Sequence, residues 1–188
     1  MKKIAVFASG NGSNFQALVD AEKQGDLQVS IELLVCDKPN AFVIQRAQAA
    51  GIPVYSFNPK DYSSKEEFER EILHELANRD IEFIVLAGYM RLIGKTLLHH
   101  YVNKIVNIHP SLLPAFPGKD AVGQAIEAGV KVMGVTIHFV DAGMDTGKII
   151  AQEAFPIPPT ATREKIEEEI HKIEHSLYPK TLNYLFYQ

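Results

Sequence analysis

The sequence contains very little cysteine, and Cys36 is its one example among 188 residues. A single thiol excludes an internal disulfide and any metal site built from cysteines. Cys36 ends the apolar run 31–36, where a small buried side chain is expected. Long apolar stretches are also missing, so we expect no membrane-spanning segment, and the run that begins at Ile4 is too short for a signal peptide. These absences favour a cytoplasmic protein.

The sequence also lacks a concentration of positive charge. The formal net charge is -4, and the 19 lysines and arginines do not gather into a block. The chain therefore has no electrostatic footprint for nucleic acid, and we expect neither a nucleic-acid nor a membrane partner. With 188 residues, of which 46% are hydrophobic and 22% charged, the chain fits a single domain, 1–188, with a sizeable core.

The first two thirds of the sequence alternate between apolar runs and amphipathic stretches. Strands are predicted at 3–8, 29–36, 52–57, 81–87 and up to residue 109. Helices are predicted at 15–23, at 41–50, from Ser63 or Ser64 to about residue 79, and at 96–101. This alternation predicts an α/β fold with a doubly wound, mostly parallel, Rossmann-like sheet.

The pattern changes in the last third of the sequence. A helix is predicted at 121–128, and the apolar runs 132–140 and 149–155 have no helix between them. We therefore expect an antiparallel hairpin that closes one edge of the sheet. A long C-terminal helix follows from Thr162, and its buried stripe is predicted to consist of Ile166, Ile170, Ile173 and Leu177.

The stretch from Asn107 to Pro114, Asn-Ile-His-Pro-Ser-Leu-Leu-Pro, contains the most informative polar residues. Its prolines force the chain to leave the sheet at His109, at the edge where open α/β sheets bind ligands. Residues two apart on a strand share a face, so Asn107 and His109 can reach one reacting atom. An amide donor suits a developing oxyanion, and an imidazole exchanges protons near neutral pH. The pair indicates an acyl-transfer site, and a histidine that merely caps a turn is the alternative.

The glycine-rich turn Gly10-Asn11-Gly12-Ser13-Asn14 joins the first strand to the first helix. Backbone N–H groups of such turns can close on an anion, helped by the helix N-terminus. Phe15 stands where a dinucleotide fingerprint has its third glycine, and no Gly-Lys-Ser/Thr follows, so neither a dinucleotide site nor a Walker loop is expected. An anion-binding turn and a plain tight turn both remain open.

Taken together, these motifs resemble one enzyme family. The stretch 107–114, followed by Phe116-Pro117-Gly118, resembles the signature of enzymes that transfer formyl from 10-formyltetrahydrofolate, and Met144-Asp145-Thr146-Gly147 resembles their aspartate loop. The resemblance spans nearly the whole chain, and the motifs come in the family's order. The opening 8–14 is similar to the branch whose formyl acceptor is the amino group of 5′-phosphoribosylglycinamide (GAR), in purine biosynthesis.

The resemblance implies a catalytic trio in which the acceptor amine attacks the formyl carbon directly. Asn107 would donate to the oxyanion, and His109 would pass a proton towards the departing folate nitrogen. Asp145 would orient His109 and favour its protonated form. No metal is implied. Residues 1–100 would form a phosphate-binding half, and residues 101–188 a folate-binding and catalytic half.

The resemblance also implies binding residues for both small-molecule substrates. The contacts to GAR would be Gly12, Ser13 and Asn14 on its phosphate, together with Glu174. The folate would be held by Lys65 near its glutamate tail and, at the pterin end, by Met90, Arg91, Leu92, Ile93 and Asn107.

Other polar residues are expected to be structural. His138 is predicted to be a satisfied histidine within a strand, and Asp141 a turn residue, because its loop lacks the ligand spacing of a calcium site. His171 and His175 lie four apart but lack a third metal ligand. Lys119 stands where some relatives carry a histidine-bearing stretch, and Lys148 where we expect proline.

Three alternative functions would use the same folate site. A formyltetrahydrofolate hydrolase would use water as acceptor, and a silent folate-binding module would bind without turnover. A methionyl-tRNA formyltransferase would need a further domain, which 188 residues are not expected to contain. The sequence is compatible with a monomer and with a homodimer.

Overall fold

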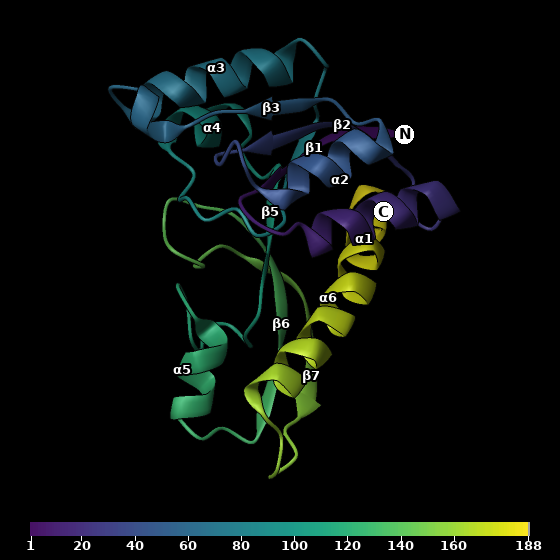
Figure 1. Cartoon of the computed structure of the whole chain (residues 1–188), viewed down its shortest axis with the longest axis vertical. Coiled ribbons are helices and arrows are strands. Elements are labelled where there is room, and N and C mark those ends of the chain that lie inside the picture. Colours follow the sequence, from purple (N-terminus) through teal and green to yellow (C-terminus); the bar gives the residue numbers. More distant parts are fainter. Residues whose placement is uncertain (188) are drawn as a thin grey trace.

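The computed structural model describes residues 1–187 and is built on a seven-stranded sheet with the order β3-β2-β1-β4-β5-β6-β7 (Figure 1). The strands are β1 (Lys2–Ala8), β2 (Val29–Cys36), β3 (Val54–Ser56), β4 (Phe83–Leu86), β5 (Ile105–His109), β6 (Val132–Phe139) and β7 (Ile149–Pro156). Strands β1 to β5 pair in parallel, whereas β6 is antiparallel to β5 and β7 to β6. The predicted parallel sheet with an antiparallel hairpin at one edge is confirmed.

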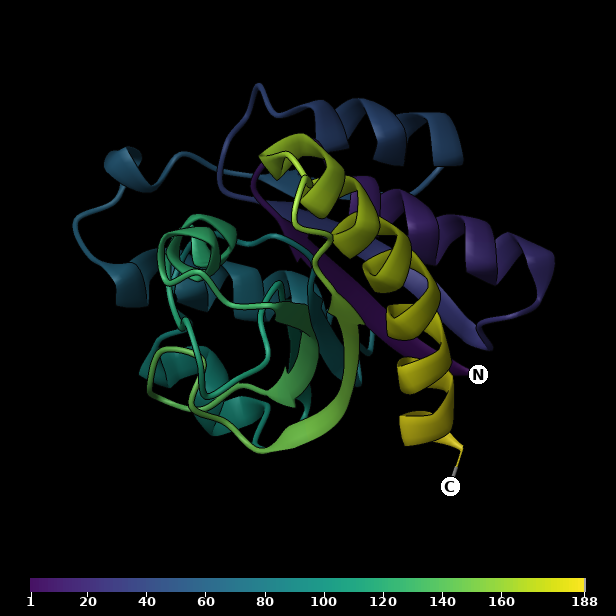
Figure 2. The same ribbon diagram turned by 90° about the horizontal axis from the view of Figure 1, so that it is seen from below.

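Helices cover both faces of this sheet. They are α1 (Ser13–Gln24), α2 (Phe42–Ala50), α3 (Lys65–Ala77), α4 (Lys95–His100), α5 (Ala121–Glu127) and α6 (Arg163–Phe186), with a 3-10 turn at Pro59–Asp61. The first, second and sixth helices pack on the face of β1 that carries Ile4 and Val6, and α3 and α4 on the face that carries Ala5 and Phe7. In Figure 2 the yellow α6 runs beside the purple α1.

The helix starts follow the capping residues in the sequence. Ser64 precedes α3, and its side-chain oxygen accepts from the Glu67 N–H at 3.2 Å. Thr162 precedes α6 and accepts from the Lys165 N–H at 3.3 Å. Both caps satisfy backbone donors that the first turn of a helix leaves free. None of the helices in residues 1–187 combines the length and apolar composition needed to cross a bilayer.

Several predicted boundaries differ from the structure by one to three residues, and two of these differences have a local reason. Strand β3 begins at Val54 because the N–H of Ile52 is already bonded to the Ala47 carbonyl, at 2.9 Å, where it closes the last turn of α2. Helix α3 ends at Ala77 because the chain turns through Asp80, which has a left-handed φ of 54°. Such backbone geometry ends a right-handed helix.

The antiparallel strands extend the sheet beyond the end of β5. Their register places Asn107 opposite His138 and His109 opposite Thr136. The loop between β6 and β7 comes so close to β6 that a Cβ at Gly147 would overlap the Phe139 carbonyl oxygen. Glycine at this position therefore allows the hairpin to close and the loop to return over the end of β5.

Tyr178 fastens α6 to the carboxyl ends of β4 and β5. Its side chain is 1% exposed. The hydroxyl lies 2.8 Å from the Leu86 carbonyl oxygen and 3.2 Å from that of Val106. One buried donor thus serves the two strand ends beside the predicted ligand edge.

We expect Tyr178→Phe to lower the free energy of unfolding by about 1–2 kcal/mol, because two buried carbonyls lose their donor. Urea denaturation followed by circular dichroism measures this loss. The matched control is Tyr184→Phe on the same helix, where the side chain is 68% exposed, and its effect should stay within about 0.5 kcal/mol. Equal losses in the two variants would contradict the role of the Tyr178 hydroxyl.

Candidate active site

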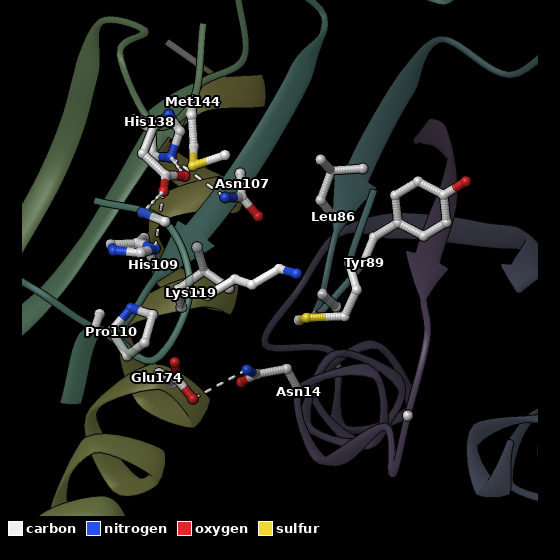
Figure 3. A pocket seen from close by; sticks show the side chains of 18 of the residues that line it. Asn14, Leu86, Tyr89, Asn107, His109, Pro110, Lys119, His138, Met144 and Glu174 are labelled. Carbon is white, nitrogen blue, oxygen red and sulfur yellow. Dashed lines mark hydrogen bonds and ion pairs between the residues drawn. The ribbon is translucent and has the colours of Figure 1, made fainter. Parts of the chain in front are cut away.

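A cavity of about 830 Å³ opens at the carboxyl edge of β1, β4 and β5. Segments that are far apart in the sequence line it, namely 10–14, 86–93, 107–110, 118–122, much of 138–146 and part of α6. Figure 3 shows their side chains converging on one space. The volume lies within the range of about 300–1,000 Å³ that is common for small-molecule pockets.

Strand β5 brings Asn107 and His109 to the same wall of the cavity, as their spacing predicted. The His109 side chain is almost fully buried, with Nε2 2.8 Å from the Phe116 carbonyl oxygen and Nδ1 3.4 Å from Oδ2 of Asp145. A carbonyl can only accept, so Nε2 carries a hydrogen. Nδ1 is therefore the ring nitrogen that can exchange a proton, and it does so beside a carboxylate.

Asp145 is held by three separate segments of the chain. Its Oδ2 accepts from the Gly118 N–H at 2.8 Å, and its Oδ1 lies 3.5 Å from Nε2 of His138. Burial by itself would raise the pKa of Asp145. The hydrogen bonds from His138 and Gly118, together with the charges of His109 and His138, outweigh that effect and hold the pKa below its ordinary value of 3.8. Asp145 is thus an anion beside His109 at neutral pH.

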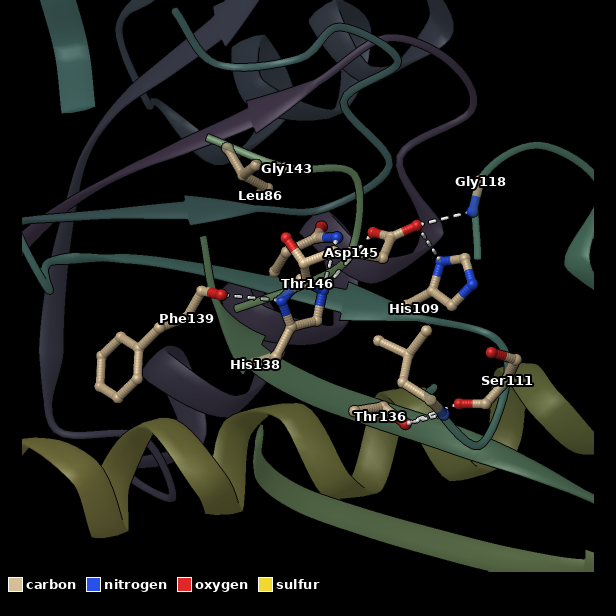
Figure 4. A network of polar contacts seen from close by, with 12 residues as sticks. Leu86, His109, Ser111, Gly118, Thr136, His138, Phe139, Gly143, Asp145 and Thr146 are labelled. Atoms are coloured by element: carbon tan, nitrogen blue, oxygen red, sulfur yellow. Dashed lines mark hydrogen bonds and ion pairs between the residues drawn. The ribbon is translucent and has the colours of Figure 1, made fainter. Parts of the chain in front are cut away.

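His138 belongs to this network, which its predicted structural role does not account for. Nδ1 lies 2.8 Å from the Phe139 carbonyl oxygen (Figure 4). Nε2 therefore faces both Asp145 and the Asn107 amide nitrogen, the latter at 3.3 Å (Figure 3). The neutral ring accepts from Asn107, and the protonated ring donates to Asp145. The register of β6 against β5 is what creates this contact, and the sequence pattern does not supply that register.

The glycine-rich turn forms the opposite wall of the cavity. Helix α1 begins at Ser13, directly after Gly12, so its first N–H groups have no partner within the helix and favour anions. Asn14 Nδ2 donates to Oε2 of Glu174 at 3.0 Å. Oδ1 of Asn14 is buried and has no partner within residues 1–187. The structure therefore brings together all four residues expected to contact GAR.

Glu174 is a carboxyl group with little solvation. Its side chain lines the cavity, yet the residue is only 5% exposed. Burial raises the pKa of Glu174 above its ordinary value of 4.5, and this effect exceeds the opposing hydrogen bond from Asn14 and the charge of His171. An incoming hydrogen-bond donor would restore the partners that water supplies in the unfolded chain.

The segment expected to read a pterin is fixed through its backbone. Met90 N–H donates to the Ser9 hydroxyl oxygen at 2.9 Å, and that hydroxyl donates to Asp37 at 2.5 Å. The other Asp37 oxygen accepts from Arg91 Nε at 2.8 Å. The side chains of Met90 and Leu92 remain 68% and 48% exposed. No role was expected for Ser9, although it lies within the stretch 8–14, or for Asp37, which belongs to no motif.

Two lysines lie close to this segment and to the cavity. Lys65, expected near the glutamate tail of a folate, donates from Nζ to the Leu92 carbonyl oxygen at 2.9 Å and is not among the residues that line the cavity. Lys119, noted in the sequence only as a departure from the family pattern, extends into the cavity (Figure 3). Asp120, next to it, pairs with Arg163 at 2.6 Å on the cavity wall.

The predicted turn role of Asp141 is confirmed. Its Oδ1 accepts from the Gly143 N–H at 2.9 Å and from the Thr146 hydroxyl at 2.6 Å. The rings of His171 and His175 are stacked with centroids 6.0 Å apart. Within residues 1–187 no group of three or more His, Cys, Asp or Glu side chains is placed to hold a metal ion.

Residues 2–182 match the sequence profile of the formyl transferase family, and the chain belongs to this family. It is 60% identical over 185 residues to phosphoribosylglycinamide formyltransferase of Bacillus subtilis (strain 168), a match that covers 98% of this chain and 95% of the relative. The structure superposes on the crystal structure of glycinamide ribonucleotide transformylase 1 from Geobacillus kaustophilus with a TM-score of 0.96, at 62% identity over 98% of each chain.

A longer relative contains a similar stretch. The trifunctional purine biosynthetic protein adenosine-3 of Drosophila melanogaster is 42% identical over 183 residues, which are 96% of this chain and 14% of the insect protein. The family predicted from the sequence motifs is confirmed.

We expect Glu174→Gln to stabilise the ligand-free protein at about pH 8. The carboxyl pKa is raised by folding, so the folded state bears the cost of a buried charge above its own pKa and bears none below the ordinary value of 4.5. Glutamine keeps the hydrogen bond from Asn14 without a charge. The gain in melting temperature should therefore shrink as the pH falls towards 4.5.

The matched control for this variant is Glu168→Gln, an exposed acid on the same helix. Its melting temperature should follow that of the unchanged protein throughout the pH series. A pH-independent gain in Glu174→Gln would contradict the assignment of the effect to a buried carboxylate.

Proposed function

We propose that this chain transfers the formyl group of 10-formyltetrahydrofolate to the amino group of GAR in purine biosynthesis. The observation behind this proposal is that Asn107, His109 and Asp145 meet on one wall of a cavity. Its other walls are the glycine-rich turn, whose free N–H groups suit an anion, and an apolar segment. The names of the relatives support GAR as the acceptor. No step in the proposed reaction uses a metal ion.

The donor side of the cavity is the segment from Met90 to Ile93. Its exposed apolar side chains suit a flat aromatic ring, and its backbone is anchored by Ser9 and Asp37. The backbone N–H and C=O groups of this segment would form hydrogen bonds to the pterin of 10-formyltetrahydrofolate. Small-molecule pockets commonly combine apolar walls with a few fixed polar groups in this way.

The acceptor side is the turn at Gly12, Ser13 and Asn14 together with Glu174. The free N–H groups at the start of α1 would hold the 5′-phosphate of GAR. Glu174 would accept a hydrogen bond from the sugar or glycinamide part of GAR, which explains why an under-solvated carboxyl group is kept at this position. The amino group of GAR would then face the catalytic wall.

The chemistry is a direct acyl transfer. The amine nitrogen of GAR forms a bond to the formyl carbon, and the carbonyl oxygen becomes an oxyanion. Asn107 has one amide N–H directed at His138 and a second to give to this oxyanion. The bond from the formyl carbon to the folate nitrogen then breaks, which yields formylated GAR and tetrahydrofolate.

One proton moves from the attacking amine to the departing folate nitrogen. His109 Nδ1 is placed to carry it, because Nε2 is bound to the Phe116 carbonyl. Asp145, an anion at neutral pH, stabilises the imidazolium that exists during the transfer. The carboxylate therefore acts through His109 and need not touch the formyl group.

The first test is absorbance-monitored turnover of a 10-formyl folate with and without GAR. We expect turnover that requires GAR, because the turn and Glu174 hold the acceptor rather than water. Equal rates in both assays would instead indicate a hydrolase. Saturable folate binding without any turnover would indicate a binding module.

The second test removes each catalytic group, with substitutions of nearly the same shape at Asn107 and Asp145. Asn107→Asp, His109→Ala and Asp145→Asn should each lower turnover by about 10²–10⁴-fold, because each removes one electrostatic or proton-transfer contribution. Circular dichroism should stay unchanged. Near-normal turnover in His109→Ala would rule out its proton-transfer role.

A further inference from the structure

Arg46, on α2, forms hydrogen bonds to the glycine-rich turn on the side of the turn that faces α2. Its Nε donates to the Asn11 carbonyl oxygen at 2.8 Å and its Nη2 to the Asn11 side-chain oxygen at 2.9 Å. A third, longer contact of 3.5 Å reaches the Gln16 side chain. The guanidinium carbon stands 4.9 Å from the centre of the Phe42 ring. Such a fork of donors can hold two oxygens at once, which a lysine ammonium cannot do with the same geometry.

The charge of Arg46 is not neutralised by a carboxylate. Its hydrogen-bond partners within residues 1–187 are uncharged oxygens of Asn11 and Gln16, and none of the ion pairs in this part of the chain includes it. In contrast, Arg91 and Arg163, which line the cavity, are paired with Asp37 and Asp120. A free positive charge thus lies directly behind the turn.

The hydrogen bonds from Arg46 to Asn11 determine the direction in which the next backbone N–H group of the turn points. The peptide between Asn11 and Gly12 is trans, so its C=O and N–H point in opposite directions. With the carbonyl bound to Arg46, the Gly12 N–H points away from α2. The Gly10 carbonyl is likewise bound to α2, through the Val43 N–H at 3.1 Å. Both carbonyls are therefore turned away from the cavity that this turn lines.

The turn also packs so closely against α2 that its backbone cannot move away from the cavity towards that helix. Gly12 has a φ of 79°, and a Cβ at this position would lie 2.6 Å from Cβ of Val43. The backbone consequently lies directly against α2, and Arg46 is the side chain of α2 that binds the Asn11 carbonyl and so orients the peptide that follows it. Hydrogen bonds in series polarise one another, so a guanidinium on the carbonyl makes the N–H of the same peptide a stronger donor.

We propose that Arg46 is a positioning residue of the site for the acceptor's phosphate, which it serves by orienting the peptide between Asn11 and Gly12 and by placing a positive charge behind it. The proposal rests on the function proposed above. Arg46 does not touch the phosphate itself, and it has no role in the formyl transfer.

The experiment measures steady-state kinetics for Arg46→Met and Arg46→Lys with both substrates varied. Methionine keeps an apolar stem against Phe42 and removes the donors and the charge. The KM for GAR should rise about tenfold or more in Arg46→Met. Arg46→Lys should recover part of this loss because it restores the charge, although not the two-oxygen grip. The kcat and the KM for the folate should remain within about twofold in both variants.

Two controls separate this role from a general loss of structure. Arg70→Met makes the same change at an exposed position of α3, where the Arg70 side chain pairs with Glu66 at 3.7 Å. This control variant should leave every kinetic constant unchanged. The second control is the acceptor without its phosphate, ribosylglycinamide. The penalty of Arg46→Met should disappear with this acceptor, because no phosphate remains for Arg46 to serve.

Three outcomes would overturn the proposal. An unchanged KM for GAR in Arg46→Met would remove the role of Arg46 and leave the proposed function intact. An equal penalty with GAR and with ribosylglycinamide would show a merely structural effect. Turnover of the unchanged protein that does not depend on GAR would overturn both the proposed function and this inference.

Discussion

The carboxylate of Asp145 joins parts of the chain that have no local reason to meet. It accepts from Gly118 in the loop after β5 and lies beside His109 at the end of β5 and His138 on β6. These contacts keep a partly buried acid ionised, since they outweigh the burial that would raise its pKa. Because the same anion lies beside both His109 and His138, and His138 in turn lies beside the Asn107 amide, the geometry of the catalytic wall depends on where the loop 141–147 closes over the sheet.

The segment 88–94, which forms another wall of the cavity, is also held by buried polar groups with assigned partners. Asp37 and Ser9 anchor the start of the segment 88–94. Glu69, which is 2% exposed, accepts from the Gly94 N–H at 2.6 Å and anchors its end. Burial raises the pKa of Glu69 above its ordinary value of 4.5, so these contacts only partly offset its desolvation. Backbone fixed in this way can leave Met90 and Leu92 exposed without a loss of order.

The charged groups on the acceptor side of the cavity match the chemical groups of the proposed acceptor. The acceptor carries a phosphate, and the turn that would hold it has helix N–H groups on one side and the unpaired Arg46 on the other. The other contact proposed for the acceptor is Glu174, whose pKa is raised by burial. A buried carboxylate lowers the stability of the folded chain, and in the proposed function it would gain a hydrogen-bond donor when the acceptor binds.

The sequence by itself determined the order of strands and helices along the chain, the helix starts at Ser63 or Ser64 and at Thr162, the point where β5 ends, and the placement of Asn107 and His109 on one face. These features follow from local periodicity, proline and capping chemistry, which act over a few residues. The sequence could not reveal the contacts made by His138, Ser9, Asp37 or Arg46. Several of those contacts join residues far apart in the sequence, such as Asn107 and His138, which are 31 positions apart. Only the tertiary structure decided them, because strand register and helix packing bring such residues together and no local pattern records that outcome.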